Sequence, residues 1–313
     1  VLFRSYINGE HIAYKTKSLQ TIHPGLNFTT LKEGASYYNG DMSVPVLFSK
    51  VLSDKEISQL VAKGYTRNTD ERILDWIPYA DTRSLLAWSD GNYEFVTSDG
   101  IKREVKVEKT GSPVMINQKW EVSFPKGLGA PEKISLPKLF SLHRHENEGV
   151  KYFSGTATYK TNFVVKPSMM SEDRVVFLDL GAVEVMAEVI VNGVNKGIFW
   201  SRPYLIDVTD VLKPGENTLE IKVTNQWTNR LIGDEQLPEE NEYVPGGGVN
   251  GIAALSRGAI RKLPDWYRNG VNKPEGGRVA FTTWKHYRKD SPLIESGLIG
   301  PVRLIPAKKI EFE

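Results

Sequence analysis

The stretch YLIDVTDVLKPGENTLEIKVTN, residues 204–225, decides the fold class of this 313-residue chain. Apolar and polar residues alternate from Leu219 to Thr224, and this period of two is typical of a strand with one buried face. Pro214-Gly215 predicts a tight turn before the strand, and the residues from Asp207 to Leu212 predict a single helical turn leading into it. The stretch therefore predicts β structure interrupted by short turns.

The same pattern of short alternating strands and turn residues recurs from residue 114 to residue 307. Asn192-Gly193 is one of the turns that separate these strands. Because no long helical pattern interrupts the strands, the sequence predicts an all-β fold, an antiparallel β-sandwich or jelly roll. The predicted strands are Lys119–Phe124, Gly155–Val165, Arg174–Leu180, Met186–Asn192, Tyr204–Val208, Leu219–Thr224, Val279–Thr283 and Val302–Ile305.

Two further regions precede this one, so we expect three parts in total: residues 1–64, 65–112 and 113–313. In the first part, Asn8-Gly9 predicts a hairpin, and Ser53 with Glu56 forms a capping box that predicts a short helix ending at Gly64. In the second part, a polar connector leads into a meander of three strands, separated by two Asp-Gly turns. These strands are Leu85–Trp88, Tyr93–Thr97 and Ile101–Val107.

The motifs YINGE, YYNGDMSV and LSDKEI of the first part resemble the second half of a laminin-G/concanavalin-like jelly roll. That resemblance implies a partial concanavalin-like sandwich over residues 1–64. Residues 1–5, VLFRS, match the translation of a common sequencing adapter, and we expect them to be an artefact of a truncated gene fragment. The lack of a signal peptide then says nothing about localisation.

Composition excludes several classes of function. The chain has no cysteine, which excludes disulfides, thiolate catalysis and cysteine-ligated zinc. Its formal net charge is +2 and no basic stripe occurs, so nucleic acid is not an expected partner. No apolar run approaches the roughly 18 residues that cross a bilayer, so no membrane span is predicted.

Three ordered motifs, VFLDLGAV (176–183), AEVIVNGVNKG (187–197) and residues 204–225, resemble the sugar-binding jelly roll of family 2 glycoside hydrolases. The resemblance implies a galactose-binding-like fold. Flanking motifs resemble the C-terminal region of large glycosidases related to family 106 α-L-rhamnosidases. These flanking motifs are WEVSFPKGLGAP (120–131), GVKYFSGTATY (149–159), NRLIGDEQLP (229–238), FTTWKHYRKDSPL (281–293) and GLIGPV (297–302).

This resemblance implies that catalysis resides in a separate (β/α)₈ barrel upstream, since nothing in the chain repeats βα units. It also implies an oligo- or polysaccharide as partner and an extracellular or periplasmic location. We therefore expect the chain to be a non-catalytic, carbohydrate-binding and structural C-terminal part of a rhamnosidase-like glycoside hydrolase. The alternative is a purely structural domain that braces the barrel and binds no sugar.

The segment WTNRLIGDEQLPEENEY (227–243) holds the first group of candidate site residues. It follows a strand directly and shows neither helical nor strand periodicity. Glycoside hydrolysis needs two carboxylates facing each other about 5–10 Å apart, and the adjacent Asp234 and Glu235 would point opposite ways in an extended chain. Either these acids bind sugar hydroxyls together with Asn229 and Arg230, or Arg230 and Asp234 pair to pin the loop.

Aromatic residues form the second group, because aromatic rings bind the apolar faces of sugars. Trp284 and His286 would share one strand face, although Trp284 also suits a sandwich core. Trp200 either contacts ligand or docks the missing barrel, and Trp266 with Tyr267 either anchors its loop or contacts ligand. The candidate carbohydrate-binding residues are Trp200, Trp227, Asn229, Arg230, Asp234, Glu235, Trp266, Tyr267, His286, Tyr287 and Asp290.

No catalytic residue, metal ligand or cofactor is predicted. His143 and His145 would lie on one face of a strand, but no third ligand has diagnostic spacing, so a solvated polar loop is favoured. Jelly rolls of this type sometimes hold structural calcium in loops that have no recognisable motif. A sugar-binding role predicts that Trp227, Arg230 and Asp234 line an open cleft, and a bracing role predicts that they are buried together.

Overall fold

The structure is a computed structural model that describes residues 2–7, 10–16, 53, 55, 74–76, 84–96, 100–244, 259–274 and 276–311. The chain divides into two compact units, Val1–Asp70 and Glu71–Glu313. In the first unit, β1 (Leu2–Ile7) and β2 (Glu10–Thr16) pair antiparallel, which agrees with the predicted hairpin. Most of the predicted helix after Ser53 and most of the partial concanavalin-like sandwich lie outside the described residues.

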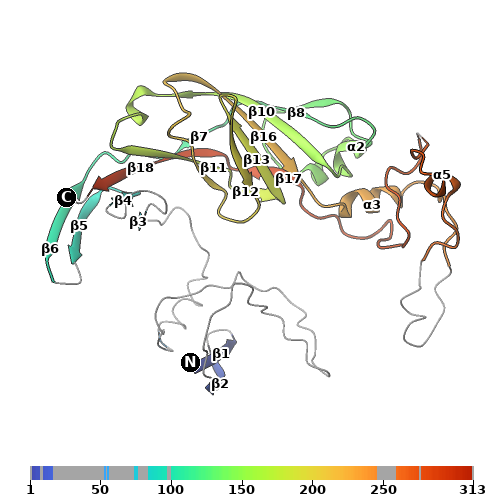
Figure 1. The fold of residues 1–313 in the computed structure, drawn as a ribbon, viewed down its shortest axis with the longest axis horizontal. Helices are drawn as coiled ribbons and strands as arrows, with labels where there is room; N and C mark the ends of the chain where they lie inside the picture. The colour runs from blue at the N-terminus through green and yellow to red at the C-terminus, as the bar shows by residue number, and fades with distance from the viewer. Residues whose placement is uncertain are drawn as a thin grey trace. The chain divides into compact units, whose positions relative to one another are not determined.

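The second unit is a sandwich of two antiparallel sheets, drawn as two stacked layers in Figure 1. One sheet has the strand order β14-β13-β16-β10-β8-β9, and the other has the order β15-β11-β18-β4-β3 with β7 also paired to β18. The strands are β3 (Leu74–Trp76), β4 (Ser84–Ala87), β5 (Gly91–Val96), β6 (Lys102–Val107), β7 (Val114–Met115), β8 (Trp120–Ser123), β9 (Lys133–Leu136), β10 (Thr156–Val165), β11 (Arg174–Asp179), β12 (Ala182–Glu184), β13 (Met186–Val191), β14 (Val194–Phe199), β15 (Leu205–Asp207), β16 (Gly215–Thr224), β17 (Gly297–Gly300) and β18 (Arg303–Glu311).

This architecture confirms the prediction of an all-β antiparallel sandwich, and its core follows from the alternation of the strands. In β16, Leu219, Ile221 and Val223 face the core and are 1% exposed or less. Trp120 on β8 and Tyr159 on β10 are equally buried. Burying each such side chain stabilises the fold by about 1.5–3 kcal/mol, so the sandwich rests on apolar burial.

Seven of the eight strands predicted between residues 114 and 307 overlap strands of the sandwich. The predicted strand Val279–Thr283 is wrong, because no strand element occupies those described residues. These residues form no strand because their backbone N–H groups have a side-chain acceptor. The N–H groups of Val279 and Ala280 both donate to the carboxylate of Asp234, at 3.0 and 2.7 Å, so they do not join a ladder.

The three strands predicted for the meander are present, but the first of them pairs elsewhere. β4 hydrogen-bonds with β18, and β5 pairs with β6. Leu85 and Ala87 of β4 form a small buried cluster with Val107 and Ile310. The turn that leaves β4 is fixed by Asp90, whose carboxylate accepts hydrogen bonds from Thr110.

Helices in the described part of the chain are short. They are η2 (Leu142–Arg144), α2 (Glu148–Lys151), η3 (Pro167–Met169), α3 (Thr228–Asp234) and α5 (Asp265–Arg268). Figure 1 shows α3 and α5 beyond one end of the sandwich and the β5–β6 hairpin at the other. Most candidate site residues therefore gather at the end where β16 leaves the sheet.

Candidate functional site

Helix α3 begins directly after β16, where the sequence pattern predicted no regular structure. The helix escapes detection because its buried face is mostly polar. Asn229, Arg230, Gly233 and Asp234 are buried together with a single large apolar residue, Ile232. Apolar periodicity is the main signal for a helix, and this helix offers almost none. Asp234 therefore sits on a helix, not on the extended chain that the sequence argument assumed.

Arg230 and Asp234 hold each other, one helical turn apart. Their side chains are 6% and 4% exposed, and the guanidinium Nη2 lies 3.0 Å from the carboxylate Oδ1. Burial lowers the pKa of Arg230, and the charge of Asp234 opposes that change. The remaining Asp234 oxygen accepts from the Ala280 N–H at 2.7 Å. Asp234 is thus occupied by internal partners, as the bracing alternative predicts.

Asn229 is a second internal clamp. Its side-chain amide donates to the carbonyl of Ile294 at 2.8 Å, and its side-chain oxygen accepts from the N–H of the same residue at 2.9 Å. Asn225, just past the end of β16 and four residues before Asn229, donates to the carbonyl of Phe153 and to the Ser296 hydroxyl. Both asparagines tie the start of the β16–β17 segment, residues 225–296, to its end.

Glu235 belongs to a chain of ion pairs with residues more than 40 positions away. Its carboxylate lies 2.6 Å from Nη1 of Arg278, which also lies 3.3 Å from Glu239. Glu239 in turn lies 2.5 Å from Nζ of Lys285. The sequence did not indicate Arg278 or Lys285 as site residues. Their partners, Glu235 and Glu239, are distant in sequence, so no local pattern identifies them.

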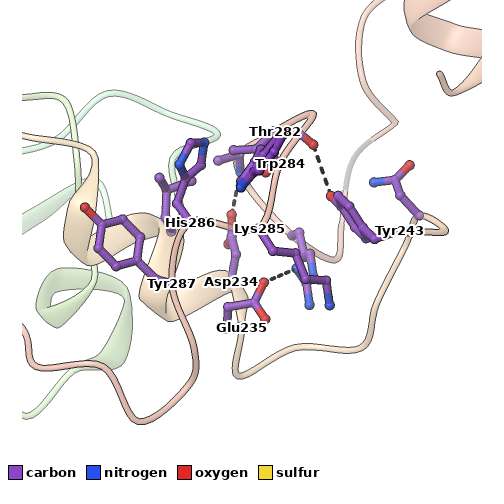
Figure 2. A pocket seen from close by; sticks show the side chains of 12 residues that line it. Asp234, Glu235, Tyr243, Thr282, Trp284, Lys285, His286 and Tyr287 are labelled. Carbon is purple, nitrogen blue, oxygen red and sulfur yellow. Dashed lines mark hydrogen bonds and ion pairs between the residues drawn. The ribbon is translucent and has the colours of Figure 1, made fainter. Parts of the chain in front are cut away.

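A small pocket lies beside this network, and Figure 2 shows its labelled side chains. Trp284 and Tyr287 are half-buried there, and His286 is exposed. The Tyr243 hydroxyl donates to the carbonyl of Thr282 at 3.0 Å. The cavity volume is about 20 Å³, which suits a single water molecule but not a sugar ring. The pocket therefore brings candidates together around a space that does not enclose a sugar ring.

The other candidates lie apart from this pocket. Trp266 and Tyr267 of α5 pack against Phe281, with ring centroids 5.1 and 5.2 Å away, and Tyr267 is also 52% exposed. Asp290 is exposed and does not line the pocket. Two tryptophans remain open to solvent: Trp200, which is 73% exposed, and Trp227, which is 52% exposed. Trp227 is therefore not buried with Arg230 and Asp234.

His143 and His145 each have a hydrogen-bond partner at Nδ1. Within the described residues, no group of three or more potential ligands could hold a metal ion. Nδ1 of His143 lies 2.7 Å from the hydroxyl of Ser141, and Nδ1 of His145 accepts from the N–H of Asn147. Burial lowers the pKa of His143, and Arg144 adds to that effect. Among the described helices, none is long and apolar enough to cross a membrane.

Comparison with known proteins identifies the domain. Residues 137–267 match the family "Glycosyl hydrolase 2 galactose-binding domain-like". A "Putative beta-glucuronidase" of Formosa agariphila is 40% identical over 214 residues, which cover 68% of this chain. The chain spans only 17% of that relative's length. The chain therefore contains a glycosyl hydrolase 2 galactose-binding-like domain and resembles a region of a larger glycosidase.

Two solved structures are also similar. A rhamnosidase from Novosphingobium sp. PP1Y is 37% identical, with a TM-score of 0.49, over 64% of this chain and 16% of its own. A β-glucuronidase from Ruminococcus gnavus is 21% identical, with a TM-score of 0.31, over 36% of this chain and 21% of its own.

Proposed function

We propose that this chain is the non-catalytic carbohydrate-binding and structural region of a larger, rhamnosidase-like glycoside hydrolase that acts on polysaccharide outside the cell or in the periplasm. The catalytic barrel would lie upstream in the same polypeptide. The match of residues 137–267 to a galactose-binding-like domain of glycosidases carries this proposal. The flanking sequence motifs favour an α-L-rhamnosidase-type enzyme.

The chemistry of the candidate acids supports a non-catalytic role. A glycosidase needs one carboxyl group that donates a proton and a second that attacks or activates water. Asp234 is 3% exposed and bound to Arg230 and two backbone N–H groups. Glu235 is paired with Arg278. Both acids are thus engaged by internal partners, which supports a structural role for them.

A bracing role without sugar binding is the second candidate, and the buried Arg230–Asp234 pair favours it. On this view the β16–β17 segment serves only to present a rigid surface to the barrel. The name of the Formosa relative suggests a β-glucuronide as an alternative substrate of the whole enzyme.

Calorimetric titration of the 313-residue chain separates these candidates. We expect heat with rhamnose-containing pectic oligosaccharides and no release of nitrophenol from 4-nitrophenyl α-L-rhamnoside or β-D-glucuronide. Hydrolysis of either aryl glycoside would overturn the non-catalytic assignment. Absence of heat with every sugar, glucuronate included, would leave the bracing role.

A further inference from the structure

We propose that Trp200 and Trp227 form one aromatic platform that binds a carbohydrate chain along several sugar residues. This inference rests on the proposed function and gives it a site. Tryptophan is highly buried on average, yet these two side chains are 73% and 52% exposed. Both belong to the same end of the sheet that carries β14, β13, β16 and β10.

The strand register places Trp200 on the outer face of that sheet. Phe199, the last residue of β14, lies opposite Ala187 and packs against the core. Because successive side chains alternate between faces, Trp200 points outward. Met186, one residue before Ala187, is 39% exposed on the same outer face.

Two threonines lie next to Met186 on the outer face. Met186 lies opposite Thr224 of β16, and Thr224 lies opposite Thr156 of β10. The two threonine hydroxyls are 2.8 Å apart. Trp227 follows Thr224 by three residues, and β14 and β16 are two strand spacings apart, or about 10 Å. Met186, Thr224 and Thr156 thus form an apolar and hydroxylated strip on the outer face, at the end of the sheet where β14 leads to Trp200 and β16 leads towards Trp227.

The next rows of the same face carry the exposed Ile198, which lies opposite Glu188, together with paired charges. Glu188 and Lys222 pair at 3.2 Å, and Lys160 and Glu220 pair at 2.8 Å. Such paired charges are typical of an ordinary solvated surface. The exposed aromatic groups are therefore confined to one end of the sheet.

A sugar chain suits this strip better than a protein does. A pyranose ring offers an apolar C–H face to an indole and hydroxyls to neighbouring polar groups. The side chains of the two tryptophans together expose about 300 Å² of surface area. A stable protein interface buries about 800 Å² on each partner. The strip of Trp200, Met186, Thr224 and Thr156 contains no charged side chain, so binding should not require a charged sugar.

Both indoles are held on rigid supports. Trp227 is the N-cap residue of α3, which Asn229 clamps to Ile294. The turn after Trp200 leads into the buried Tyr204, whose hydroxyl donates to the carbonyl of Val185 at 2.6 Å. A preformed platform loses little conformational entropy when a ligand binds.

The test is calorimetric titration of the whole chain with L-rhamnose and with a disaccharide, a tetrasaccharide and a hexasaccharide of rhamnogalacturonan. We expect affinity to rise with chain length up to the tetrasaccharide or beyond. Trp200→Ala and Trp227→Ala should each weaken tetrasaccharide binding about tenfold, a loss of about 1.4 kcal/mol. Circular dichroism and unfolding curves should match those of the unmodified chain.

Val164→Ala is the matched control, because Val164 is 64% exposed on β10 towards the opposite end of the same sheet. It should bind the tetrasaccharide as the unmodified chain does. Equal affinity for rhamnose and hexasaccharide, or full binding by either tryptophan variant, would overturn the platform but leave the proposed function intact. No heat with any saccharide would overturn both.

Discussion

Between the two sheets of the sandwich, the buried apolar side chains of β16 are Leu219, Ile221 and Val223, whereas just past its end the buried polar side chains are Asn229, Arg230 and Asp234. All six are 5% exposed or less. The sandwich is therefore stabilised by apolar area, and the β16–β17 segment by polar groups that must all find partners. Apolar packing degrades gradually when one side chain shrinks, but a buried polar group that loses its partner keeps the full cost of desolvation.

The largest expected effect lies in the sandwich. Trp120 is 1% exposed within the core, so Trp120→Ala removes a large apolar side chain and leaves a cavity. We expect a loss of about 4 kcal/mol in the free energy of unfolding, measured by urea denaturation. Val194→Ala, at a position 47% exposed on β14, is the control and should change little. A loss below about 1 kcal/mol for Trp120→Ala would contradict the account of the core.

The second largest loss of stability is expected from a substitution in the β16–β17 segment. Asp234→Ala leaves Arg230 buried without its counter-charge and should cost about 3 kcal/mol. Hydrogen exchange should quicken at the amides of Val279 and Ala280, which donate to Asp234. The double variant Arg230→Met/Asp234→Leu should recover part of the loss, because it buries no unpaired charge. A double variant no more stable than Asp234→Ala would count against this explanation.

A smaller effect is expected for the neutral clamp. Asn229→Ala removes two hydrogen bonds to the backbone of Ile294 and should cost about 2 kcal/mol in urea denaturation. Asn162→Ala is the matched control, since Asn162 makes one exposed hydrogen bond to Glu216. Equal losses for the two variants would mean that burial does not set the strength of these contacts.

The smallest effect concerns pH. The side-chain hydroxyl of Thr110 and its backbone N–H lower the pKa of Asp90 below its ordinary value of 3.8. A carboxyl group whose pKa is lower in the folded state stabilises the fold above its unfolded pKa, and that stability is lost as pH falls through the folded pKa. The free energy of unfolding of Asp90→Asn should therefore be lower than that of the unmodified chain at neutral pH, and the two values should converge in strong acid. A gap that persists in strong acid would refute this role.

The sandwich could be predicted from the sequence because alternation and turn residues are local signals. The pattern of Leu219 to Thr224 defined β16, and Asn192-Gly193 predicted the turn between β13 and β14. Several strands were missed. β9 and β17 have four residues each and no alternation beyond them, whereas the equally short β8 lies in the longer alternating run Lys119–Phe124.

The candidate site was only partly predictable. Chemical type identified Arg230 and Asp234 as a pair, and the geometry bears out that alternative. The partners of Glu235 and Asn229 could not be found, because Arg278 and Ile294 are distant in sequence and carry no motif. Whether Trp200 and Trp227 contact a sugar remains a prediction of the platform proposal.

The position of β18 has a consequence for how the protein is made. Arg303–Glu311 is the last described strand, yet it lies in the interior of its sheet, between β11 and β4, and also pairs with β7. A chain emerges from the ribosome with its N-terminal end first. The edges of β11 and β4 that pair with β18 must therefore stay unpaired until translation has passed residue 311. Only then can β18 hydrogen-bond with both strands.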